Sequence, residues 1–377
     1  MLINLRNALM AGKRLPYDAE VEYLESSGTQ YIDTGYSFNS ATDKVELVFE
    51  LLTTTPNYKW IFGAYDTKRF AIGSGDNVDR RTFGYNASTS YISSTYYTDG
   101  AHIFLADSTG ASIDGQNFFG FADFSTTSHI LLYTIPLNPS VYCSNARIWS
   151  YKHYRNGTLV RDYIPVRKGT VGYLYDRVSG KLFGNAGTGD FVLGPDVVPV
   201  EWLEGTGTQY IDTGVGYFAD FEINVKMRTS LSNITLYSGA YNRLERISAA
   251  RPYWRFRSNA GGTYDSTIPI TELHTLAWRN GKIYSDGAEI YQLSKPYQNY
   301  EMYAFGTDTS AFSCVIYYLD LWDSNDTIVR KFRPVRVGTG STWEGAMMDV
   351  LTRRIYRNAR TGAFGYGNDL KYPIPAE

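Results

Sequence analysis

Short runs of β-forming residues alternate with turn residues along almost the whole chain. Segments such as KVELVFELL (44–52), HIFLADS (102–108) and HTLAWRN (274–280) are rich in Val, Ile, Phe, Leu and Trp, and Gly, Asn, Asp and Ser separate them. Such runs favour strands packed on one face, and no segment of helical period follows each of them, which argues against a parallel α/β fold. The pattern therefore predicts an all-β, antiparallel protein.

Two tight turns strengthen this prediction. DRVSGKLF (176–183) places Gly180 where a hairpin needs a positive φ, and WRNGKIYSDG (278–287) contains the hairpin dipeptide Asn280-Gly281. A helical period occurs at the amino terminus, where Leu2, Leu5 and Leu9 fall on one helical face. We expect one short helix there, within an arm of residues 1–19.

The chain repeats itself. VEYLESSGTQYIDTG begins at Val21 and VEWLEGTGTQYIDTG begins at Val200, with twelve of fifteen positions identical. Further matches follow in the same order: His102 with His274, Cys143 with Cys314, RDYIPVR with RKFRPVR, and NAGTG with NARTG. A collinear series of this kind predicts two copies of one domain, which we place at 20–195 and 198–372.

Composition narrows the class of protein. The formal net charge is −2 and the charges are spread evenly, so no basic surface predicts a nucleic-acid partner. No apolar run approaches the length of a membrane-spanning helix, and the amino terminus lacks the apolar core of a secretory signal. We expect synthesis in a cytoplasm without membrane insertion. The two cysteines, one per copy, are expected to be buried thiols.

The strings YLESSGTQYIDTG, ARIWSYKHYRNGTLVRDYIPVR and YDRVSGKLFGNAGTG resemble the laminin G-like branch of the concanavalin A-like jelly rolls. They are similar in particular to copies in proteins of bacteriophages, prophages and gut bacteria. The resemblance covers about residues 20–370 and implies two tandem antiparallel jelly-roll sandwiches. It implies no ligand by itself, because function in such folds resides in loops or on one sheet.

Catalytic chemistry finds little support in the residues. Glucanases of this sandwich fold carry an ExDxE string on one strand, and the chain has none. The repeated acids Glu25 with Asp33, and Glu204 with Asp212, are better explained by hydrogen bonding in turns. We therefore expect no enzymatic activity. No cofactor is predicted, although calcium is an alternative, with the loop acids Asp66, Asp107 and Asp308 as candidate ligands.

The segment RPYWRFRSN (251–259) is the main binding candidate. Aromatic and cationic residues alternate in it, and sugar rings stack on aromatic faces while guanidinium groups donate to hydroxyls. The alternative is an ordinary strand with Trp254 in the core and the arginines outside. YNASTSYISSTYY (85–97) occupies the corresponding stretch of the first copy. The candidate glycan-binding residues are Tyr253, Trp254, Arg255, Arg257, Tyr91 and Tyr96.

Three functions follow from these observations. The first is a non-enzymatic bacteriophage virion protein, of the tail or head fibre or decoration type, that displays lectin-like domains for attachment to host glycans. The second is a bacterial cell-surface adhesin, and the third is a glycoside hydrolase with a cryptic site. For the first, we expect Leu2, Leu5 and Leu9 to dock the arm on other virion proteins and the chain to form a homo-oligomer.

Overall fold

The computed structural model describes residues 15–52, 58–74, 80–86, 88–93, 100–119, 123–215, 220–227, 243–248, 250–258, 262–293, 302–306, 313–323 and 325–370. The chain divides into two compact units, with the division between Asp196 and Val197. The predicted helix with Leu2, Leu5 and Leu9 lies outside the described residues. No helix among the described residues is long and apolar enough to cross a bilayer.

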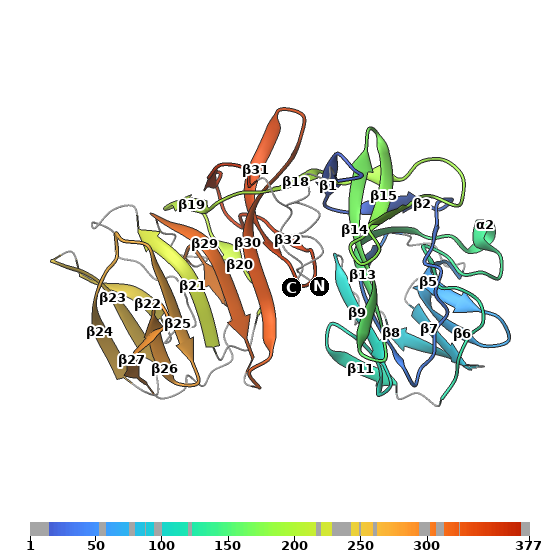
Figure 1. The fold of residues 1–377 in the computed structure, drawn as a ribbon, viewed down its shortest axis with the longest axis horizontal. Coiled ribbons are helices and arrows are strands. Elements are labelled where there is room, and N and C mark those ends of the chain that lie inside the picture. Colours follow the sequence, from blue (N-terminus) through green and yellow to red (C-terminus); the bar gives the residue numbers. More distant parts are fainter. Residues whose placement is uncertain are drawn as a thin grey trace. The chain divides into compact units, whose positions relative to one another are not determined.

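The first unit is built from antiparallel strands (Figure 1). Its elements are β1 (Ala19–Val21), β2 (Leu24–Ser27), β3 (Ile32–Asp33), β4 (Asp43–Leu51), β5 (Trp60–Tyr65), β6 (Arg69–Ser74), β7 (Arg80–Asn86), β8 (Ser88–Ser93), β9 (His102–Asp107), β10 (Gly110–Ile113), β11 (Gln116–Phe119), β12 (Leu131–Leu132), α2 (Pro139–Tyr142), β13 (Asn145–Arg155), β14 (Thr158–Lys168), β15 (Val171–Asp176), β16 (Lys181–Phe183) and β17 (Val192–Leu193). β18 (Asp196–Pro199) spans the division.

Two sheets face one another in the first unit. One sheet has the order β3-β12-β5-β6-β7-β8. In the other, β11, β10, β9, β4 and β13 follow one another, and the far edge of β13 pairs with β2 in its first half and with β14 in its second. Rings from both sheets meet between them, as Phe62 of β5 and Phe104 of β9 do at 5.2 Å. Figure 1 shows β5 to β8 as one layer and β9, β13 and β14 as the other.

The second unit repeats these pairings. Its strands are β19 (Leu203–Thr206), β20 (Ile211–Asp212), β21 (Asp220–Met227), β22 (Arg243–Ser248), β23 (Arg251–Ser258), β24 (Gly262–Pro269), β25 (His274–Arg279), β26 (Lys282–Ser285), β27 (Ala288–Gln292), β28 (Tyr303–Ala304), β29 (Ser313–Trp322), β30 (Ile328–Thr339), β31 (Thr342–Asp349), β32 (Ile355–Tyr356) and β33 (Gly365–Tyr366). β29 takes the place of β13, between β21 on one side and β19 with β30 on the other. The sheet β22-β23-β24 contributes Trp254 to a core shared with residues of the large sheet.

The two predicted hairpins are present, and a third turn carries an unexpected residue. Gly180 has a φ of 71° between β15 and β16, and Asn280 and Gly281 have φ values of 51° and 79° between β25 and β26. In the second unit the turn between β31 and β32 has no glycine, and Arg353 occupies it at a φ of 66°. The backbone N–H of Arg353 donates a hydrogen bond to Asp349 O at 2.7 Å. The turn therefore forms with a strained arginine where the first unit uses glycine.

The equivalence of the two cysteines is wrong. Gly28 and Gly207 do correspond, with φ values of 102° and 105°. Leu24 pairs with Ile148 and Ser26 with Ala146 in the first unit, while Leu203 pairs with Ile316 and Gly205 with Cys314 in the second. Cys314 thus takes the place of Ala146. Cys143 instead precedes β13, and its backbone forms an isolated β-bridge with Trp60. Both thiols are buried and free, as expected.

Candidate functional site

The predicted glycan segment forms β23, the central strand of the sheet β22-β23-β24. Trp254 and Phe256 are 0% exposed and lie in the core of the second unit. Successive side chains of a strand point to opposite faces, so the residues at even positions here face inward. The assignment of Trp254 as a stacking surface for sugars is therefore wrong, and the alternative of a core tryptophan is the one observed.

The opposite face of β23 carries the exposed residues. Tyr253 is 36% exposed, and Arg251 and Arg257 are exposed as well. Arg255 lies in the same row but is bound in a bidentate pair by Asp265, with Nη2 to Oδ2 at 2.9 Å. This hydrogen bond raises the pKa of Arg255, and burial opposes the shift. Among the predicted glycan-binding residues whose side chains are described, Tyr253 and Arg257 are thus the exposed ones.

The other predicted residues are only partly described. Tyr91 belongs to β8, where its backbone is the register partner of Thr82, and its side chain lies outside the described set. Tyr96, Leu2, Leu5, Leu9 and Asp308 lie outside the described residues.

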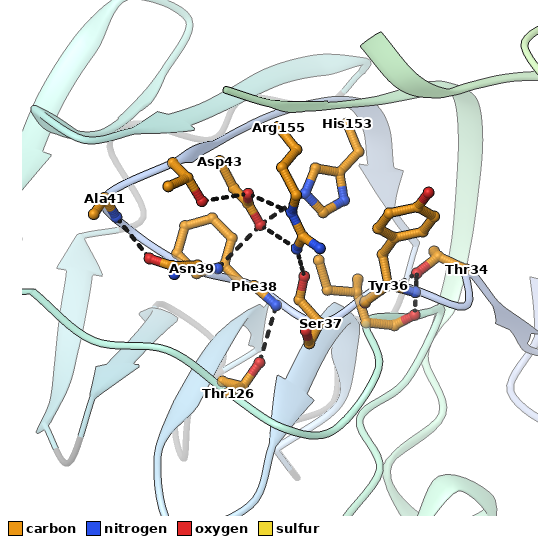
Figure 2. Close-up of polar contacts among 12 residues, drawn as sticks. Thr34, Tyr36, Ser37, Phe38, Asn39, Ala41, Asp43, Thr126, His153 and Arg155 are labelled. Carbon is orange, nitrogen blue, oxygen red and sulfur yellow. Dashed lines mark hydrogen bonds and ion pairs between the residues drawn. The ribbon is translucent and has the colours of Figure 1, made fainter. Parts of the chain in front are cut away.

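A buried polar cluster that sequence reasoning missed joins the start of β4 to the end of β13 in the first unit (Figure 2). Asp43, the first residue of β4, is the register partner of Arg155, the last residue of β13. Arg155 donates from Nε to Asp43 Oδ1 at 2.9 Å and from Nη2 to Oδ2 at 2.8 Å. Its Nη2 also donates to Ser37 O at 2.8 Å, which ties the loop before β4 to the end of β13.

His153 completes the cluster. Its side chain is 0% exposed, and its Nε2 lies 3.0 Å from Asp43 Oδ2. Because a carboxylate only accepts, Nε2 carries the proton, and in the neutral ring Nδ1 accepts from the Tyr151 hydroxyl at 3.3 Å. Tyr36 covers the ring edge-on, with centroids 5.5 Å apart. The histidine is therefore saturated by protein partners on both nitrogens.

The electrostatics of Asp43 follow from its partners. Burial alone would raise its pKa, but hydrogen bonds from Arg155 and His153 outweigh burial and hold the pKa well below the ordinary range. The backbone N–H of Asn39 adds a further bond to Oδ2 at 3.0 Å, and the Thr42 hydroxyl adds one to Oδ1 at 2.9 Å. A carboxylate saturated in this way does not act as a nucleophile or base, so the cluster is a brace between elements.

The second unit has other residues at these positions. Leu321 stands where the first unit has His153, because it pairs with Arg330 as His153 pairs with Arg161. Trp322 stands where the first unit has Tyr154. Arg279 lies over the Trp322 ring at 3.9 Å from its centroid. A signal for the first cluster was present in the sequence: Tyr151, His153 and Arg155 alternate on one face of a strand.

Each unit also holds a histidine–aspartate pair at one strand start. His102 Nδ1 lies 2.7 Å from Asp114 Oδ2, and His274 Nδ1 lies 2.8 Å from Asp286 Oδ2. In both units the other carboxylate oxygen accepts the backbone N–H that follows the histidine, at 2.9 Å. The repeated spacing from histidine to an Asp-Gly dipeptide was the sequence signal for these pairs.

The acids considered for catalysis or calcium have protein partners. Glu25 is bound to Arg147 at 2.7 Å, and Asp33 accepts the N–H of Gly35 at 2.8 Å. Asp66 accepts N–H groups of Lys68 and Thr127, and these backbone bonds outweigh burial and lower its pKa to about 2. Asp107 accepts from Thr109 in its own turn. In the described part of the chain, no group of three or more His, Cys, Asp or Glu side chains is arranged to hold a metal.

No protein-family model matches the chain, and no curated protein matches it. Among solved structures, domains LG4-5 of the mouse laminin alpha1 chain are similar at 14% identity over 97% of each chain, with a TM-score of 0.29. The binding domain of botulinum neurotoxin serotype D/C VPI 5993 is similar at 11% identity over 88% of this chain and 89% of that one, with a TM-score of 0.21. At these TM-scores the likeness supports no conclusion, and the fold rests on the strand pairings.

Proposed function

We propose that the chain is a non-enzymatic carbohydrate-binding protein, built from tandem laminin G-like sandwiches and displayed on a bacteriophage particle. The observation that carries the binding role is the outward row of β23, where Tyr253 and Arg257 are exposed on one face of a sheet. A tyrosine ring offers a stacking surface to a sugar, and a guanidinium donates to its hydroxyls. The sheet supports both side chains on a strand that is held on both edges.

The virion assignment rests on the sequence. GTQYIDTG and RVSGKLFGNAGTG resemble strings found in proteins of phages and gut bacteria, and the arm with Leu2, Leu5 and Leu9 suits docking on another virion protein. Detection of the chain by mass spectrometry in purified phage particles tests this assignment. Detection on a bacterial cell surface, with none in particles, would favour the adhesin alternative.

Glycan binding is tested by titrating the full chain against a panel of bacterial surface polysaccharides. We expect Tyr253→Ala and Arg257→Ala each to weaken binding about tenfold or more, as residues at the centre of a binding surface do. Matched controls are Tyr291→Ala, another exposed tyrosine of the second unit, and Arg360→Ala, an exposed arginine distant in sequence. Equal effects from controls and test variants, or no binding to any polysaccharide, would contradict the proposed surface.

The same panel tests the absence of catalysis. We expect no release of reducing sugar on prolonged incubation with any polysaccharide that binds. Measurable release by tag-free protein would instead support the glycoside hydrolase alternative.

A further inference from the structure

The sheet β22-β23-β24 places two acidic residues opposite one arginine of β23. Arg255 is the register partner of Glu245 on β22 and of Asp265 on β24. It forms a bidentate pair with Asp265, and its Nη1 lies 3.8 Å from Glu245 Oε1. These two carboxylates therefore compensate the charge of the central arginine.

Arg257, two residues further along the same face of β23, has a different setting. Its register partners are Arg243 on β22 and Thr263 on β24, so no acidic residue stands opposite it. Its side chain is exposed, and it forms no hydrogen bond or ion pair within the part of the chain that the structure describes. The guanidinium of Arg257 is therefore available to an anion from solvent.

The opposite end of the same row attracts anions less. Arg251 is exposed there, but it shares the field of a carboxylate. The hydrogen bond from Arg255 lowers the pKa of Asp265, burial opposes the shift, and the nearby charge of Arg251 adds to the lowering. Because this attraction is mutual, it offsets part of the positive charge of Arg251. An anionic ligand thus finds its strongest attraction on this face at Arg257.

The spacing of Tyr253 and Arg257 sets the kind of ligand that contacts both. They are four residues apart on one strand, and a rise of about 3.3 Å per residue separates their Cα atoms by about 13 Å. A single sugar ring is shorter than this separation. A ring that stacks on Tyr253 therefore leaves Arg257 to contact another part of the ligand, which must be a chain of sugars.

We propose that the outward face of β23 selects anionic polysaccharides, with a carboxylate or phosphate of the polymer bound by Arg257 and a neighbouring sugar ring stacked on Tyr253. The guanidinium fork suits both anions, because it donates two parallel hydrogen bonds to the oxygens of either. Thr263, exposed beside Arg257 on β24, adds a hydroxyl that donates to the same anion. The inference rests on the proposed glycan-binding function and names the class of glycan.

The test is isothermal titration of the full chain with two matched pairs of polymers. One pair is polygalacturonate and the same polymer with its carboxyl groups reduced to alcohols. The other pair is phosphomannan and its dephosphorylated form. We expect at least one charged polymer to bind more tightly than its neutral counterpart by about tenfold or more, the value of a hydrogen bond to a charged group. The pair that shows the difference distinguishes carboxylate from phosphate recognition.

Variants of the chain assign the effect to one residue. Arg257→Gln should weaken binding of the charged polymer about tenfold and reduce its sensitivity to added salt, since the screened charge is then absent. Arg257→Lys, which keeps the charge without the fork, should retain part of the affinity. Arg360→Gln removes another exposed arginine of the second unit and should leave binding unchanged.

Equal affinity for the charged polymers and their neutral counterparts would overturn this inference and leave the proposed glycan binding intact. Unaltered binding in Arg257→Gln, or an equal loss in Arg360→Gln, would do the same. So would binding of neutral polysaccharides from the panel together with no binding of either charged polymer. If no polysaccharide of any kind binds, the proposed function fails and this inference fails with it.

Discussion

Asp43 and Arg155 form a bidentate ion pair in which the carboxylate is wholly enclosed, while the guanidinium side chain is 33% exposed. The pair joins the start of β4 to the end of β13, and Arg155 extends it to the loop through Ser37 O. Burial of this carboxylate is tolerated because protein donors replace the water molecules that it would otherwise bind. The pair therefore works as a brace whose removal leaves charges without partners.

Asp43→Asn is expected to destabilise the first unit by about 3 kcal/mol, the lower end of the cost of breaking a buried ion pair, because Arg155 stays partly solvated. Chemical denaturation, with the transition of each unit followed separately, measures the change. Asp190→Asn, at an exposed position, is the matched control and should change stability by less than about 0.5 kcal/mol. A loss confined to the second unit would contradict the placement of the brace.

The stability of the first unit should depend on pH through Asp43. The folded pKa of this group lies below its value of about 3.9 in the unfolded chain, so the unfolded state binds more protons at acid pH. Its contribution is full above about pH 5 and is lost as the pH falls below about 4 toward the folded pKa. Unfolding free energies of the unchanged chain and Asp43→Asn, measured from pH 7 to pH 3, should draw closer toward the acid end without becoming equal, because the folded carboxylate is still ionised at pH 3. A constant difference across the range would show that the carboxylate charge is not responsible.

Neighbouring residues of β23 should behave in opposite ways. Trp254→Ala removes a fully buried ring and is expected to cost the second unit about 3–5 kcal/mol. Tyr253→Ala removes a ring on the outward face and should cost about 1 kcal/mol or less. Thermal unfolding of both variants measures the contrast. Similar losses for the two would mean that the strand faces are not separated as described.

Deletion of residues 1–14, which lie outside the described residues, tests the docking arm. We expect both sandwiches to keep nearly the same melting temperature, while incorporation into particles or self-assembly is abolished, because a short apolar helix needs a partner surface. Calorimetry and sedimentation velocity provide the measurements. A truncated chain that loses several degrees of stability and still assembles would show that the arm covers its own domain.

Sequence patterns predicted local features well and long-range registers poorly. The turns at Gly180 and Asn280-Gly281 were predicted because each needs only a positive φ within a few residues. The match of Cys143 with Cys314 failed because structural equivalence depends on strand pairing, in which β2 meets Ala146 where β19 meets Cys314. The partners of His102 and Asp43 were missed for the same reason, since each bond joins separate strands or turns.

The sequence by itself determined the β class, the repeated segments, the hairpin turns and the buried thiols, because periodicity and backbone preference act over a few residues. Tertiary structure decided which face of each strand is buried and which polar groups meet. It placed Trp254 in the core and Tyr253 outside, and it enclosed Asp43 between Arg155 and His153. Both outcomes depend on how two sheets stack and pair, and contacts between distant segments leave no periodic trace along the chain.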